Sequence, residues 1–148
     1  MTSGWHQSTV RLASKGRGFH LVTDEIERGV PEIRNYRVGI CHLFLQHTSA
    51  SLSINENCDP DVRRDMEDIT NSIVPESRSY RHQAEGADDM PAHVKSSLFG
   101  CSLTIPIQSG QFALGTWQGI YLCEHRNRGG SRNVVVTIQG EARNPQKK

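Results

Sequence analysis

The chain has 148 residues and a formal net charge of +1, from 17 Lys and Arg against 16 Asp and Glu. This length allows one domain, residues 1–148, that buries about two thirds of its unfolded surface. The balanced charge argues against a nucleic-acid-binding protein, and no apolar run approaches the roughly 20 residues that span a membrane. Residues 1–10 are polar where a secretory signal is apolar, so we expect a cytoplasmic protein.

The first half of the chain predicts two strands with a short helix between them. Trp5–Leu12 is typical of an opening strand. Asp24 and Glu27 form a capping box, which predicts a helix through Arg28 that ends at Gly29 and Pro31. Tyr36–His47 predicts a long strand whose two faces alternate, and Ser49–Ile54 continues it after a kink or bulge. One face carries Val38, Ile40, His42, Phe44 and Gln46; the other carries Gly39, Cys41, Leu43, Leu45 and His47.

Two helices are predicted in the middle of the chain. Asp59 can cap the first, and Pro60 suits its first turn. Its apolar residues recur at helical spacing before Val74-Pro75 ends it: Val62, Met66, Ile69 and Ile73. Ser77–Met90 shows no periodicity and is the longest irregular stretch. Pro91 begins a second short helix, Ala92–Phe99, which Gly100 closes.

The last third predicts a meander of strands. These are Cys101–Ile107, Phe112–Glu124 and Asn133–Gln139, separated by turns at Ser109-Gly110 and Arg126–Ser131. We therefore expect an α+β fold, a mostly antiparallel, sandwich-like sheet core with two or three short helices. Four cysteines lack the spacing of a metal ribbon and predict reduced, mostly buried thiols: Cys41, Cys58, Cys101 and Cys123.

His82 and His93 bracket an acidic segment that contains Glu85, Asp88 and Asp89. This arrangement places imidazoles and carboxylates together at a loop-to-helix junction, as metal or phosphate chemistry requires. The alternative is a solvated acidic loop that happens to contain histidines. His93 and Ser97 share one helical face, while Val94 and Leu98 are expected to pack on the neighbouring one and Lys95 to be solvated or to contact a phosphate.

Other candidate residues lie at strand ends and turns. His47 can present a ring nitrogen to a cleft while the hydroxyls of Thr48 and Ser49 bind phosphate oxygens, or these residues form a turn that bonds its own backbone. Glu56 is a candidate general base or carboxylate ligand, and the alternative is a solvated carboxylate. Arg132 is the best candidate for an anion contact among the turn arginines.

Gly115 and Gly119 flank Trp117 within the predicted strand. Two glycines so close together suggest that a ligand or a neighbouring chain approaches the backbone, and the alternative is a bulge in the sheet.

Three long segments together resemble the YjbQ family, also called the secondary thiamine-phosphate synthase family. They are HTSASLSINENCDPDVRRDME (His47 to Glu67), YRHQAEGADDMPAHVKSSLFG (Tyr80 to Gly100) and LGTWQGIYLCEHRNRGGSR (Leu114 to Arg132). The resemblance extends from Trp5 to Glu141 and implies a compact β-rich α+β fold, usually a homotrimer. It places the family's signature residues on His47, His82, His93, Glu56, Asp89 and Gln118, and those of one subgroup on His125.

The resemblance implies a metal ion held near the three histidines and a weak thiamine-phosphate synthase activity, a transferase reaction. That reaction needs a cation and two phosphate contacts, for which Lys95, Ser97 and Arg132 are candidates. Mg²⁺ would serve a synthase, yet three imidazoles suit Zn²⁺ or another transition metal better.

Because three imidazoles suit a transition metal better than the Mg²⁺ of a synthase, two further functions stay open. One is a metal-dependent hydrolase of a small phosphate or ester, in which Glu56 or Asp89 accepts a proton from water. The other is a non-enzymatic metal- or ligand-binding trimer. All three functions predict that His47, His82 and His93 converge within a few ångströms, and none requires a nucleic acid or a membrane.

Overall fold

A computed structural model describes residues 3–143 of the chain. Its elements in chain order are β1 (Ser3–Leu12), β2 (Gly18–Leu21), α1 (Thr23–Gly29), a 3-10 helix (Pro31–Asn35), β3 (Tyr36–Leu45), β4 (Ala50–Glu56), α2 (Pro60–Ile73), α3 (Asp89–Phe99), β5 (Ser102–Gln108), β6 (Gln111–Phe112), β7 (Gln118–Glu124) and β8 (Arg132–Ala142). This is the α+β fold that the sequence predicts, with α2 and α3 between β4 and β5.

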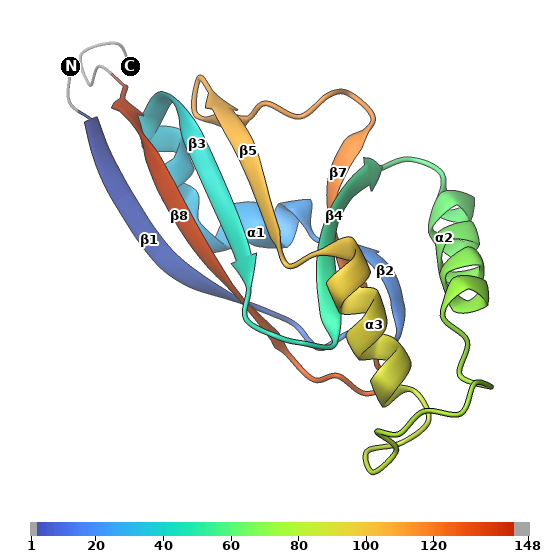
Figure 1. The fold of residues 1–148 in the computed structure, drawn as a ribbon. Helices are drawn as coiled ribbons and strands as arrows, with labels where there is room; N and C mark the ends of the chain where they lie inside the picture. The colour runs from blue at the N-terminus through green and yellow to red at the C-terminus, as the bar shows by residue number, and fades with distance from the viewer. Residues whose placement is uncertain (1–2, 144–148) are drawn as a thin grey trace.

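The strands form two antiparallel sheets. The larger has the order β1-β8-β3-β5-β6, and the smaller has the order β2-β7-β4. Figure 1 shows the long strands of the larger sheet side by side, with the smaller sheet and then the helices α2 and α3 beyond them. Consecutive strands in the sequence are seldom neighbours, so both sheets depend on pairing between distant segments.

The main core lies between the two sheets and also takes in α1. Side chains of both sheets share one buried cluster, for example Leu43 and Val136 from the larger sheet and Leu52 and Leu122 from the smaller. β7 is buried on both faces, because Tyr121 and Cys123 point the other way, toward Phe19 and Met66. The smaller sheet is therefore the middle layer, and α2 and α3 cover its second face.

The alternation predicted for the long strand is confirmed in β3. Cys41, Leu43 and Leu45 are buried, whereas Val38, Ile40 and Phe44 are exposed on the outer face of the larger sheet. The strand ends at Leu45, before His47. The prediction that Ser49–Ile54 continues it is wrong, because this segment is β4, which pairs with β7 in the other sheet.

The prediction of a single strand over Phe112–Glu124 is also wrong, because a turn at residues 113–117 interrupts it. Gln118 N–H donates to the carbonyl of Gly115 at 3.0 Å, and Gly115 N–H donates to the side chain of Gln118 at 2.8 Å. The chain leaves the larger sheet at β6 and enters the smaller at β7, so it needs this turn. The space beside Gly119 is filled by Leu21 and Asn57 of the same chain rather than by a neighbouring one.

The helix predictions are partly right. Asp59 caps α2 by accepting from Asp61 N–H at 2.9 Å, as predicted. The capping box for α1 is wrong: that helix starts at Thr23, and its N-cap, Val22, has no side-chain bond. The apolar stripe of α2 is buried only in part, since Ile69 and Ile73 are 57% and 63% exposed.

Helix α3 turns a different face inward from the one that the sequence suggests. It begins at Asp89, two residues before Pro91, and buries Asp89, Ala92, Lys95 and Ser96. Leu98, which was expected to pack, is 60% exposed, and Lys95, which was expected to be solvated, is 1% exposed. A buried serine explains the orientation, because Ser96 Oγ donates to the carbonyl of Ala50 on β4 at 2.7 Å.

The cysteines are all unpaired, as predicted, with Cys41 and Cys123 buried and Cys58 exposed. Burial raises the pKa of both buried thiols to about 12, so they stay protonated. Within residues 3–143, no helix combines the length and the apolar character that crossing a bilayer requires.

Candidate metal centre

Four side chains converge where the irregular segment meets α3. They are His82, Glu85, Asp89 and His93, and one ligand atom from each lies within 4.8 Å of all the others. Asp89 Oδ2 is central: it is 2.6 Å from His82 Nε2 and 3.2 Å from His93 Nε2. Glu85 Oε2 lies 4.0 Å from His82 Nε2 at the exposed side. Two of these residues are buried or half-buried and two are exposed, so the cluster opens to solvent.

Local structure explains why these groups meet. Asp89 and His93 are one helical turn apart in α3 and therefore lie on the same face of the helix. His82 reaches them from the preceding loop, which tightens at Gly86, where φ is +108°. The two imidazole rings are 5.6 Å apart between centroids and tilted by 59°, so they converge on Asp89 without stacking on each other.

The backbone determines which nitrogen of His93 faces the cluster. His93 Nδ1 lies 2.7 Å from the carbonyl oxygen of Thr48, which can only accept, so Nδ1 carries a hydrogen. The lone pair of a neutral His93 is then on Nε2, opposite a carboxylate oxygen of Asp89. Two lone pairs at 3.2 Å repel each other unless a positive charge lies between them. A proton or a metal ion meets that need, and a histidine bonded to a backbone carbonyl is the usual arrangement of a metal ligand.

Arg126 forms ion pairs with the carboxylates of Asp88 and Asp89. Its Nη1 donates to Asp89 Oδ1 at 2.5 Å and its Nε donates to Asp88 Oδ2 at 2.9 Å. Burial alone would raise the pKa of Asp89, but the hydrogen bond from His82 and the charges of His93 and Arg126 hold that pKa below its ordinary value. Asp89 therefore remains a carboxylate. No local pattern in the sequence indicates this role of Arg126, because its partners are 37 and 38 residues away.

His47 is not part of the cluster, although the sequence predicts that it joins His82 and His93. Its Nε2 accepts a hydrogen bond from the backbone N–H of Asn133 at 2.8 Å. A neutral ring that accepts at Nε2 carries its hydrogen on Nδ1, so neither nitrogen has a free lone pair. Burial, followed by the charge of Arg132, lowers the pKa of His47 and favours this neutral form. The turn after β3 accounts for the difference, since it directs the ring toward the start of β8.

The predicted phosphate contacts around Ser49 are already occupied. Arg132 is 4% exposed and makes a two-pronged ion pair with buried Glu124, at 2.7 Å from Nε and 2.5 Å from Nη2. The same Nη2 lies 3.0 Å from Ser49 Oγ. The guanidinium of Arg132 is thus committed to the protein, and Thr48 contributes its carbonyl oxygen to His93.

Lys95 and Ser97 diverge from the cluster. Lys95 lies on the opposite side of α3, where its Nζ donates to Asn71 Oδ1 at 2.7 Å. Burial, followed by the charge of Arg17, lowers the pKa of Lys95. Ser97 is exposed. Neither residue has a contact that directs it toward His82 or His93.

Glu56 and Gln118 face each other in the β4–β7 register at the far end of the smaller sheet. Glu56 accepts from Asp59 N–H at 3.2 Å at the start of α2, and Gln118 accepts from Gly115 N–H. The opposite end of this register, Ala50 with Glu124, adjoins α3. Six strand steps of about 3.3 Å separate the two ends by roughly 20 Å, so these side chains belong to a different region.

His125 is buried behind α3, where its Nε2 lies 2.8 Å from Ser51 Oγ. Its ring lies between two aromatic rings, with centroid distances of 6.3 Å to Phe19 and 5.8 Å to Phe99. A Ser–His pair is a nucleophile only where a substrate can reach it. Ser51 is 0% exposed and His125 is 1% exposed, so this pair is part of the core.

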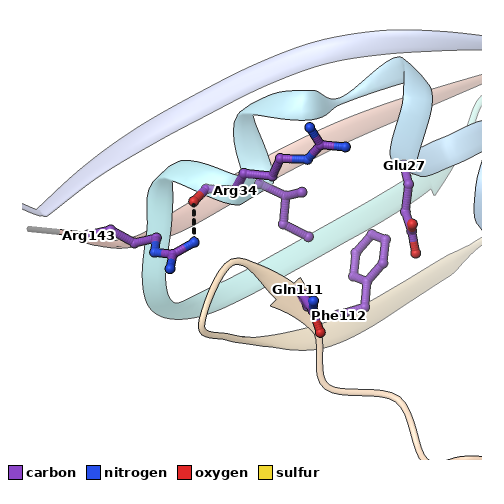
Figure 2. A pocket seen from close by; sticks show the side chains of 6 residues that line it. Glu27, Arg34, Gln111, Phe112 and Arg143 are labelled. Atoms are coloured by element: carbon purple, nitrogen blue, oxygen red, sulfur yellow. Dashed lines mark hydrogen bonds between the residues drawn. The ribbon is translucent and has the colours of Figure 1, made fainter. Parts of the chain in front are cut away.

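A pocket of about 370 Å³ adjoins the cluster. His82 forms part of its wall, and the other lining residues come mostly from the irregular segment: Glu76, Arg78, Ser79, Tyr80, Gln83, Gly86, Ala87 and Met90. A second pocket, of about 500 Å³, lies near the other end of the larger sheet (Figure 2). Arg34, Arg143 and Glu27 line it, and none of the candidate site residues does.

The donor set fits a transition-metal ion. Two imidazole nitrogens and two carboxylates are typical ligands of Zn²⁺ and its neighbours, whereas Mg²⁺ prefers oxygen ligands alone. The spacing of the ligand atoms is close to what bonds of about 2 Å around a common centre require. The residues that would hold the ion are therefore His82, Asp89 and His93, with Glu85 on the open side.

The fold and this cluster define a small α+β protein with a histidine–carboxylate centre at a loop–helix junction. A family model described as UPF0047 protein YjbQ-like matches residues 8–141. The chain belongs to this YjbQ (UPF0047) family. UPF0047 protein YjbQ of Escherichia coli O157:H7 is 55% identical over 137 residues, which cover 93% of this chain and 99% of that protein. UPF0047 protein YugU of Bacillus subtilis is 38% identical over 103 residues, covering 70% and 76%.

Solved structures agree with the fold. A Clostridium acetobutylicum protein described as an uncharacterized conserved protein of the yjbq/upf0047 family superposes with a TM-score of 0.73 at 35% identity, covering 90% of this chain and 98% of that one. A YbjQ-like protein of unknown function from Sulfolobus solfataricus P2 has a TM-score of 0.83 at 24% identity, covering 95% and 100%, and shares the fold.

Proposed function

We propose that this chain is a metal-dependent hydrolase of a small phosphate or ester. The observation that carries the proposal is the convergence of His82, Glu85, Asp89 and His93, with the lone pair of His93 directed at a carboxylate. A bound transition-metal ion would lower the pKa of a coordinated water to about 7 and so supply a nucleophile at neutral pH.

The residues around the cluster would orient the ligands and accept a proton from water. His93 is oriented by Thr48, and Asp89 is oriented by Arg126, so both ligands are held before anything binds. Glu85 is 63% exposed on the open side of the cluster, which makes it the best acceptor for a proton from water. The adjoining pocket contains Arg78 and Ser79, which suit a small anionic substrate.

Thiamine-phosphate synthesis is the second candidate, and its support comes from the resemblance alone. It requires protein cations for two phosphate groups, and the predicted ones are Lys95 and Arg132. Both are buried in internal bonds, to Asn71 and Glu124 respectively. The nitrogen-rich donor set also favours a transition metal over Mg²⁺. The hydrolase explains more of the geometry.

Elemental analysis of tag-free protein tests the metal site. We expect roughly one transition-metal ion per chain in the wild type, and its loss in His82→Ala and His93→Ala. His42→Ala, a histidine on the outer face of the larger sheet, is the control and should keep the ion. His47→Ala should also keep it, because His47 lies outside the cluster. Metal-free wild-type protein after zinc reconstitution would contradict the proposal.

Hydrolysis of p-nitrophenyl phosphate and p-nitrophenyl acetate by the zinc-loaded protein tests the activity. Loss of a ligand should lower turnover at least about 100-fold, and Glu85→Gln should lower turnover while the metal is retained. A metal-loaded protein that hydrolyses neither compound would leave the third function, a non-enzymatic metal-binding protein.

A further inference from the structure

A third pocket, of about 450 Å³, lies at the end of the smaller sheet that is far from the histidine cluster. Residues from β2, α1, the end of β4 and the turn before β7 line it: Leu21, Thr23, Asp24, Asn57, Cys58, Trp117 and Gln118. The β4–β7 register places Glu56 and Gln118 here and Ala50 and Glu124 at the other end, roughly 20 Å away. Nothing in the proposed hydrolysis uses this pocket.

Trp117 is held in place in the wall of this pocket although it is 63% exposed. Its carbonyl accepts from Asn57 N–H at 2.9 Å. Asn57 Nδ2 donates to the carbonyls of Thr116 and Gln118, on either side of Trp117, at 3.1 Å each. The two bonds between Gly115 and Gln118 close the turn beneath it. The backbone that presents the indole is therefore rigid, which lowers the entropy that a ligand must overcome.

The charge in the pocket has one sign. Among the described residues that line it, Asp24 is the one acidic side chain, and none is Lys, Arg or His. The hydrogen bonds that hold the turn involve Nδ2 of Asn57 and Oε1 of Gln118. The other atom of each amide group, the acceptor Oδ1 of Asn57 and the donor Nε2 of Gln118, can therefore bind a ligand. An anionic ligand would meet the Asp24 carboxylate without a compensating cation, whereas a cation would meet an indole and a carboxylate.

We propose that this pocket binds a small planar organic cation, with the ring of the ligand on Trp117 and its charged nitrogen at Asp24. Tryptophan provides the strongest cation–π partner among the side chains, and the indole adds apolar contact area. The pocket in Figure 2 is a contrast, because two arginines, Arg34 and Arg143, line it together with Glu27, so a cation would meet like charges there.

Three ligands of almost identical shape test the role of charge: benzamidine, a cation; benzamide, which is neutral; and benzoate, an anion. The chain has two tryptophans, so the Trp5→Phe variant makes Trp117 the sole indole reporter. We expect saturable quenching by benzamidine with a Kd on the order of 1 mM, at least about fivefold weaker binding of benzamide, and no saturation by benzoate.

Asp24→Asn in the same background should weaken benzamidine binding to the level of benzamide. Asp65→Asn, which removes an exposed carboxylate from α2, is the matched control and should change nothing. Circular dichroism establishes that each variant is folded. Equal affinities for benzamidine and benzoate, or an unchanged affinity in Asp24→Asn, would overturn the proposal. Binding should also persist in His82→Ala, so that failure of the metal centre and failure of this site are separate results.

Discussion

His125 shows how burial and neighbouring charges determine a residue's chemistry. It is 1% exposed, and its Nδ1 has no partner among residues 3–143. Burial, followed by the charges of Lys95, Arg17 and Arg132, lowers its pKa to about 3, well below the ordinary histidine value of about 6.5. The ring is therefore neutral throughout the physiological range, and Nε2 and Ser51 Oγ share a single hydrogen bond in the core.

This burial makes the fold sensitive to acid. Below pH 6.5 the unfolded chain binds a proton at His125, whereas the native state binds one only near pH 3, so stability is lost as the pH falls through this window. The wild type should lose about 2 kcal/mol more than His125→Gln between pH 7 and pH 5. Urea unfolding at the two pH values measures the difference. His42→Gln should behave like the wild type, and an unchanged pH dependence in His125→Gln would show that His125 is not responsible.

At the scale of elements, the sequence predicts what local spacing encodes. The alternation of β3 and the start of α2 at Asp59-Pro60 are both visible within a few residues, and both are confirmed. β2 was not predicted, because it is a four-residue strand whose only sheet partner, β7, lies about a hundred residues later. The switch of β4 to the other sheet and the turn at 113–117 likewise depend on which distant strand is the neighbour.

The candidate site was likewise predictable only where it depends on residues close together in the sequence. His82, Asp89 and His93 are predicted to gather because they lie in one short segment at a loop-to-helix junction. That Asp89 is itself in α3, one helical turn before His93, is not predicted, because the helix is expected to begin at Pro91. Two contacts could not be predicted from local patterns, because their partners are far apart in the sequence. Arg126 binds Asp89 across 37 residues, and His47 accepts from Asn133 across 86 residues. Lys95 is buried rather than solvated, because α3 turns inward the face that carries Ala92, Lys95 and Ser96, and Ser96 donates to the carbonyl of Ala50.

The pairing of β3 with β8 requires a glycine contact that substitution should break. Gly39 and Gly140 face each other, and a methyl group on Gly39 would overlap the Gln139 carbonyl and lie 2.7 Å from Gly140 Cα. Gly39→Ala should therefore destabilise the protein by about 2 kcal/mol and lower the Tm by roughly 4–8 °C. Gly4→Ala is the control, because Gly4 also pairs with Gly140 but has open space beside it. Equal Tm values for the two variants would contradict this account.

At the scale of the whole molecule, the outer face of the larger sheet carries a group of exposed large apolar side chains. Trp5 is 69% exposed, and Val38, Ile40 and Phe44 are between 43% and 46% exposed. The register places Trp5, Gln139 and Ile40 in one row across three adjacent strands, so these side chains form a continuous surface. A surface of this kind marks an interaction site. We propose that further copies of the chain cover it, in the homotrimer that the family resemblance implies.

Light scattering gives a direct test of this assembly. A trimer of the 16.6 kDa chain has a mass of about 50 kDa, and cyclic symmetry would give each chain the same interface. Ile40→Arg places a charge at the centre of the proposed interface and should shift the mass to that of the monomer, because a buried unpaired charge is costly. Ile73→Arg provides the matched control, since this residue of α2 is even more exposed, at 63%. If Ile73→Arg dissociates the protein instead, the interface lies on the layer of α2 and α3. A monomeric wild type would exclude the trimer.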